Sequence, residues 1–162
     1  MDIQVACGIG HGPTELSAFD HALVKAGVNN FNLIYLSSVV PPKSTVTPIE
    51  GPAQVSGEWG DRLYLVMAQQ RTSVRDEEVW AGIGWILNEE TGKGLLVEHE
   101  GHSRMQVEHD IEHSLAALIA NRPGEKFGPV NMKVTGAACH DRPVCALVVA
   151  VFESASWQTA RR

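Results

Sequence analysis

The sequence has little positive charge and no long apolar run. Its 162 residues hold 13 Lys and Arg against 19 Asp and Glu, which gives a formal net charge of −6. The one basic cluster is the terminal Arg161-Arg162. Because phosphate binding needs clustered Lys and Arg, we expect no nucleic-acid partner. The longest apolar run, Val144 to Phe152, is about half of what a membrane helix needs, so we expect no membrane span.

Cysteine is scarce, and the start of the sequence has no leader pattern. Cys7, Cys139 and Cys145 are an odd number at no metal-ligand spacing. Residues 1–10 lack the basic start and long apolar stretch of a secretory signal. We therefore expect free thiols, no metal and a cytoplasmic protein. A chain of this length can bury roughly 70% of its unfolded surface. We therefore expect one domain over residues 1–162 that needs no disulfide or metal to be stable.

The spacing of apolar residues predicts two principal helices. The first covers residues 14–27, with Thr14 as its N-cap and Gly27 as its stop. The second covers residues 103–121 and opens at Ser103 in capping-box form. In both, an apolar residue recurs every three or four positions, so each has one face suited to packing on a sheet.

Apolar runs between the helices predict strands at 2–7, 31–36, 62–67, 79–87, 94–99, 130–138 and 144–152. The last four form two expected hairpins. We expect residues 8–13 to be a glycine-rich turn and residues 41–60 an irregular connection. Gly82 and Gly84 weaken the strand over 79–87, where a short helix is the alternative. These elements predict an α+β fold, a layered αββα sandwich of mainly antiparallel strands with two principal helices.

Two adjacent serines, Ser37 and Ser38, end the strand over 31–36 and precede Val-Val-Pro-Pro. The ordinary interpretation is a strand end whose hydroxyls bond nearby backbone. The chemical alternative is that the Ser38 hydroxyl attacks the Ser37 carbonyl and shifts the acyl group from nitrogen to oxygen. The resulting ester can eliminate, which cuts the chain and leaves a pyruvoyl group at residue 38. Such a group can form a Schiff base with an amine and accept the electrons of a departing carboxylate.

The blocks ELSAFDHALVKAGVNNFNLIYLSSVVPP and KGLLVEHEGHS resemble the pyruvoyl-dependent arginine decarboxylase family. The likeness spans nearly the whole chain, and the first block is long and specific. It implies cleavage at Ser37-Ser38 into a β chain of residues 1–37 and an α chain of residues 38–162, with a covalent pyruvoyl group derived from Ser38. It also implies that L-arginine is converted to agmatine and carbon dioxide, as in polyamine biosynthesis. The family's assembly is a trimer or a dimer of trimers with shared pockets.

The resemblance implies roles for three further residues. Asn32 matches an asparagine associated with self-processing, and Asp20 matches the acid that receives the substrate guanidinium. Glu98 matches the acid that returns a proton to the decarboxylated carbon. From the residues alone, a solvated surface acid is the alternative interpretation of both Asp20 and Glu98. Glu100 can face the same side of its strand as Glu98, so it is the rival proton donor.

Other interpretations stay open. His109 and His113 match the H-x-x-E-H pattern of a zinc hydrolase helix, which would need a third ligand. A non-catalytic, uncleaved relative with a structural role is also compatible with the sequence. Three positions depart from the family's usual residues, namely His11, Pro13 and His99, and a retuned pocket would take another basic amino acid in place of arginine.

Overall fold

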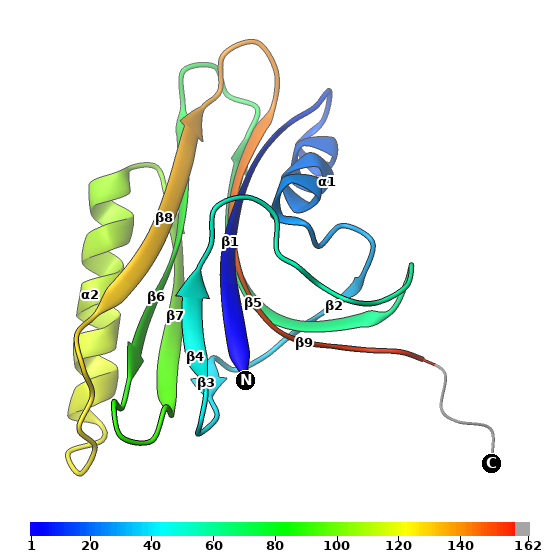
Figure 1. Cartoon of the computed structure of the whole chain (residues 1–162). Coiled ribbons are helices and arrows are strands. Elements are labelled where there is room, and N and C mark those ends of the chain that lie inside the picture. The colour runs from blue at the N-terminus through cyan, green and yellow to red at the C-terminus, as the bar shows by residue number, and fades with distance from the viewer. Residues whose placement is uncertain (158–162) are drawn as a thin grey trace.

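The computed structural model describes residues 1–157, which fold into four layers (Figure 1). Helix α1 (Glu15–Ala26) covers the outer face of a five-stranded sheet. That sheet faces a four-stranded sheet, whose outer face is covered by helix α2 (Arg104–Ala120). The predicted α+β sandwich with two principal helices is therefore confirmed.

The five-stranded sheet has the order β2-β5-β9-β1-β4, and the four-stranded sheet has the order β3-β7-β6-β8. The strands are β1 (Asp2–His11), β2 (Asn32–Tyr35), β3 (Val39–Val40), β4 (Thr45–Pro48), β5 (Arg62–Thr72), β6 (Glu78–Leu87), β7 (Gly94–Gly101), β8 (Asn131–Ala138) and β9 (Val144–Ala155). The pairs β1–β4 and β2–β5 are parallel, and the other pairs are antiparallel.

Three apolar clusters hold the layers together, one between the two sheets and one beneath each helix. Both helices begin and end close to the predicted residues. Thr14 caps α1, and Gly27 ends it in the left-handed conformation with φ of 80°. Under α2, Ile111 and Leu115 are fully buried, and each contributes roughly 1.5–3 kcal/mol of hydrophobic stabilisation.

The expected turn over residues 8–13 is wrong, because β1 continues as a strand through most of this segment. The glycines instead permit close contact between β1 and α1. A Cβ on Gly8 would lie 2.0 Å from the carbonyl oxygen of Ala22, and a Cβ on Gly10 would lie 2.1 Å from that of Ala18. Only glycine lets the helix backbone approach the strand this closely.

Two other expectations about strands need correction, and the strand predicted over 79–87 is confirmed as β6. The last two strands do not form a hairpin, since β8 pairs with β6 in one sheet and β9 pairs with β1 and β5 in the other. The connection over residues 41–60 contains β4. Gly82 and Gly84 leave β6 intact, and a Cβ on Gly84 would lie 2.2 Å from Cγ2 of Ile111 on α2. The glycines again mark a close helix–strand approach.

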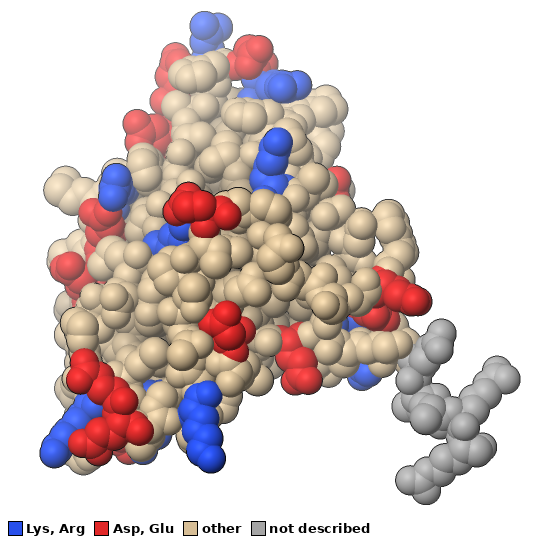
Figure 2. All heavy atoms as spheres, viewed as in Figure 1, with Lys and Arg blue, Asp and Glu red and all other residues tan. Residues whose placement is uncertain are grey.

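Charged side chains on the face drawn in Figure 2 lie dispersed, with Lys and Arg among Asp and Glu rather than in one patch. The basic pair Arg161-Arg162 lies outside the described residues. Within residues 1–157, neither helix is long and apolar enough to cross a membrane.

Candidate active site

The serine pair lies where the chain passes from one sheet to the other. Only residues 36–38 separate β2 in the first sheet from β3 in the second. Leu36 still belongs to the first sheet, because its N–H donates to the carbonyl of Leu65 at 2.9 Å. Ser38 already belongs to the second sheet, because its carbonyl accepts from the N–H of Leu96 at 2.9 Å. The Ser37–Ser38 peptide bond therefore sits in the corner between the two sheets.

The Ser38 side chain makes a short hydrogen bond at this corner. Its hydroxyl donates to Oε1 of Glu98 on β7, and both residues are half-buried. Glu98 points toward the gap between the sheets, because Leu96, two residues earlier on the same strand, packs in the core that fills this gap. A carboxylate that accepts from a hydroxyl is placed to remove its proton.

The backbone of Ser38 is held in an unfavourable conformation. Its φ is 65°, in the left-handed region that a residue with a side chain rarely adopts. This conformation costs about 1–2 kcal/mol for an L-residue. Cleavage of the peptide bond before Ser38 removes the constraint on φ, so the strain favours cleavage. The geometry defines a serine whose hydroxyl is hydrogen-bonded to a carboxylate and whose own backbone has an unfavourable φ.

The rival acid and one departure from the family pattern lie elsewhere. Glu100 is exposed, and the hydroxyl of Ser38 bonds Glu98 instead. His99 turns to the opposite face of β7, where its Nε2 lies 2.8 Å from the hydroxyl oxygen of Ser114 on α2. The residue at position 99 therefore contacts the helix layer. It does not contact Ser37 and Ser38 between the two sheets, a pair called the serine corner below.

Asn32 is not brought to the serine pair. It starts β2, and its side-chain amide donates to the carbonyl of Gly60 at 2.6 Å. A strand rises about 3.3 Å per residue, so the five positions from Asn32 to Ser37 span roughly 16 Å. Within one chain, this amide fixes the start of β2 beside β5, and its role in self-processing stays a prediction.

Asp20 is also separate from the corner. It is exposed on α1, and α1 packs on the face of the first sheet that points away from the second sheet. Beside it, Phe19 stacks under the guanidinium of Arg71, with 4.7 Å from the guanidinium carbon to the ring centre. Burial raises the pKa of the nearby Tyr35 phenol, and the positive charge of Arg71 opposes that shift. Among residues 1–157, no hydrogen bond or ion pair joins Asp20 to the serine corner.

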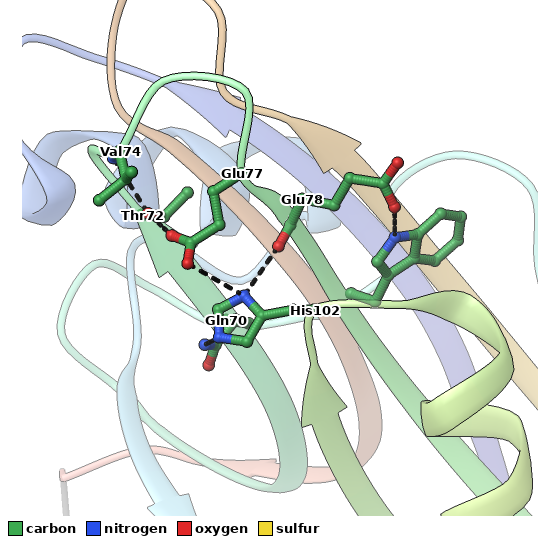
Figure 3. Close-up of polar contacts among 7 residues, drawn as sticks. Gln70, Thr72, Val74, Glu77, Glu78 and His102 are labelled. Atoms are coloured by element: carbon green, nitrogen blue, oxygen red, sulfur yellow. Dashed lines mark hydrogen bonds and ion pairs between the residues drawn. The ribbon is translucent and has the colours of Figure 1, made fainter.

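A polar network that no sequence pattern revealed anchors the far end of β7 (Figure 3). Nδ1 of His102 lies 3.0 Å from the carbonyl oxygen of Glu78, and its Nε2 lies 3.3 Å from the amide nitrogen of Gln70. The Thr72 hydroxyl donates to Glu77, whose other oxygen lies 3.6 Å from His102. Because His102 directly follows β7, the network fixes the strand that carries the candidate base. Its residues come from distant segments, so no local signal marks them.

The zinc-hydrolase interpretation has no third ligand in the described part of the chain. His109 and His113 are exposed on α2, with ring centres 6.1 Å apart and planes inclined by 8°. Residues 1–157 contain no group of three or more His, Cys, Asp or Glu placed to hold a metal ion.

Known proteins of one family resemble this chain over most of its length. The family model for pyruvoyl-dependent arginine decarboxylase (PvlArgDC) matches residues 2–156. The chain belongs to this family. A pyruvoyl-dependent arginine decarboxylase of Halobacterium salinarum is 40% identical over 83 residues, 51% of each chain. One of Thermoplasma volcanium is 31% identical over 129 residues, 78% of this chain and 69% of that protein, and one of Thermococcus sibiricus is 29% identical over 141 residues, 87% of each. The Halobacterium match spans about half the length of that relative.

Proposed function

We propose that this chain cuts itself between Ser37 and Ser38 and then decarboxylates L-arginine to agmatine and carbon dioxide. The observation that carries the proposal is the hydrogen bond from the Ser38 hydroxyl to Glu98 at a left-handed residue. Membership of the family supports both the covalent pyruvoyl group and arginine as the substrate. The products of cleavage are a β chain of residues 1–37 and an α chain of residues 38–162.

Glu98 acts first as a general base in this scheme. It accepts the hydroxyl proton while Oγ of Ser38 attacks the carbonyl carbon of Ser37. The proton passes to the nitrogen of Ser38 as the C–N bond breaks, which leaves an ester between Ser37 and Oγ. Elimination releases Ser37 as a carboxylate, and hydrolysis of the remaining enamine releases ammonia. The pyruvoyl group that results supplies a ketone that can accept the electrons of a departing substrate carboxylate.

After cleavage, Glu98 and Asp20 have separate tasks. Glu98 remains beside residue 38, where a proton must be returned to the product carbon. Asp20 binds the substrate guanidinium in a bidentate pair, so Asp20→Asn is expected to raise KM more than it lowers kcat. Because α1 lies on the outer face of the sandwich, we infer that a neighbouring copy supplies Asp20, in a trimer or a dimer of trimers. A stable monomer with full activity in sedimentation would contradict the shared pocket.

The decisive experiment is a denaturing gel with intact-mass analysis of purified protein held at neutral pH. The wild-type protein is expected to give two chains, and the α chain to have an N-terminus blocked to Edman degradation. Ser38→Ala is expected to remain one inactive chain. Ser37→Ala is the matched control, because it keeps the nucleophile and is expected to cut. Wild-type protein that stays a single chain of full mass would refute the enzyme and leave the uncleaved structural relative.

A further inference from the structure

Strand β7 holds residue 38 at two points. Its Glu98 accepts from the Ser38 hydroxyl, and the N–H of Leu96, two residues earlier, donates to the Ser38 carbonyl at 2.9 Å. Leu96 is 1% exposed, so the second bond lies at the edge of the core between the sheets, where water competes little. The hydroxyl and the carbonyl of Ser38 therefore both face β7, at a residue whose φ is 65°.

We propose that the backbone N–H of Leu96 is a catalytic donor that polarises the Ser38 carbonyl during the elimination step of self-cleavage. The inference rests on the proposed function, because it assumes that the ester forms. It assigns a chemical task to a hydrogen bond that would otherwise be an ordinary link between β7 and the start of β3.

The elimination explains why this carbonyl matters. Glu98, which has passed its first proton to the nitrogen, takes the Cα hydrogen of Ser38 as a proton, and the electron pair of that bond forms the double bond between Cα and Cβ. The Cβ–Oγ bond breaks, and Ser37 leaves with its electrons as a carboxylate. While the Cα–H bond breaks, negative charge spreads onto the oxygen of the adjacent carbonyl. A donor aimed at that oxygen in a dry site stabilises the charge as it develops.

The later steps need no reagent other than water. The enamine at residue 38 takes up one water and releases one ammonia, so no oxidant or reductant is consumed. Removal of one such preorganised donor typically slows a reaction by roughly 10²- to 10³-fold. We expect an effect of this size, about 10²- to 10³-fold, because Leu96 is buried and water has little access to replace the lost bond.

The two adjacent leucines of β7 allow a matched test. Leucic acid, the α-hydroxy acid of leucine, replaces the backbone N–H by an ester oxygen and keeps the side chain. It is introduced in the full chain at Leu96 in one protein and at Leu95 in the other. Strand alternation turns the N–H of Leu95 toward β6, where it pairs opposite Ile86, so this control loses a sheet bond without touching Ser38. Cleavage is followed on denaturing gels, with thermal unfolding to show that both proteins fold.

Treatment with hydroxylamine distinguishes a catalytic role of the Leu96 N–H from a merely structural one, because only a block at the elimination step makes the ester intermediate accumulate. It cuts the ester intermediate and also the ester built into β7, so the readout is the fragment that begins at residue 38 and ends before the built-in ester. Where the intermediate was cut, this fragment begins with an intact serine and is heavier by one ammonia than the same fragment with a pyruvoyl group. We expect the Leu96 ester protein to accumulate this hydroxylamine-sensitive form and the Leu95 ester protein to cleave at the wild-type rate.

Three results would overturn the proposal. The first is equal cleavage of the two ester proteins, whether fast or slow. The second is a Leu96 ester protein that stays uncut at residue 38 and gives no fragment beginning with serine after hydroxylamine, which places the block before the ester intermediate. The third is unmodified protein that never cleaves, which removes the proposed function as well and is thereby distinguished from the first two.

Discussion

Replacement of Glu98 by glutamine tests the base while keeping the shape of the site. The amide oxygen of glutamine can still accept the hydrogen bond from Ser38, but it cannot take the proton as a carboxylate does. The hydroxyl of Ser38 donates to Glu98, and the exposed Glu100 is the matched control. We expect Glu98→Gln to slow self-cleavage and Glu100→Gln to leave it unchanged.

The size of the effect follows from the exposure of the site. A general base contributes typically 10²- to 10⁴-fold. Ser38 and Glu98 are half-buried, so water can act in place of the lost carboxylate, and we expect the lower part of this range, about 10²- to 10³-fold. Protein that has been cut despite Glu98→Gln is expected to turn over arginine more slowly as well, since the proton donor is missing.

The assay is a time course from freshly translated protein, with both chains resolved on a denaturing gel and weighed by mass spectrometry. Unfolding in urea shows whether either variant is destabilised. Cleavage of Glu98→Gln within about threefold of the wild-type rate would refute the assignment of the base. If Glu100→Gln protein cleaves itself slowly and Glu98→Gln protein cleaves itself rapidly, Glu100 is the general base instead.

Three further predictions concern stability and reactivity. Ser38→Gly and Ser38→Ala both abolish cleavage, but glycine tolerates φ of 65°, so the glycine variant should be more stable in urea by about 1 kcal/mol. Gly10→Ala should lose about 1–3 kcal/mol, because its Cβ would lie 2.1 Å from the α1 backbone, whereas Gly124→Ala, with nothing within 4 Å, should be neutral in the same titration. Burial raises the pKa of Cys7 and Cys145 to about 11, so their thiols are protonated at pH 8. Iodoacetamide should modify them slowly in the native protein, faster as pH rises toward that value, and rapidly in urea; fast native labelling at pH 8 would contradict this.

The layers of the fold were predictable from local chemistry, and the glycines were not. Thr14 and Gly27 mark the ends of α1 because capping depends on residues a few positions apart. Gly8 and Gly10 follow the same local pattern as a turn, yet their function is to admit α1, whose approach depends on the whole layer. The assignment of β8 and β9 to different sheets is likewise set by long-range pairing, which a short loop between two apolar runs does not reveal.

The serine corner combines both kinds of information. The sequence shows the serine pair and, separately, the strand with Glu98, and the resemblance to a family joins them. The structure gives the physical link, which is the two-residue strand β3 paired to β7. This pairing brings together Ser38 and Glu98, which lie 60 positions apart in the chain. Since a shift of one residue in the register turns each side chain to the opposite face, such a shift would turn the Ser38 hydroxyl away from Glu98. The register of β3 on β7 is therefore what keeps the Ser38 hydroxyl on Glu98.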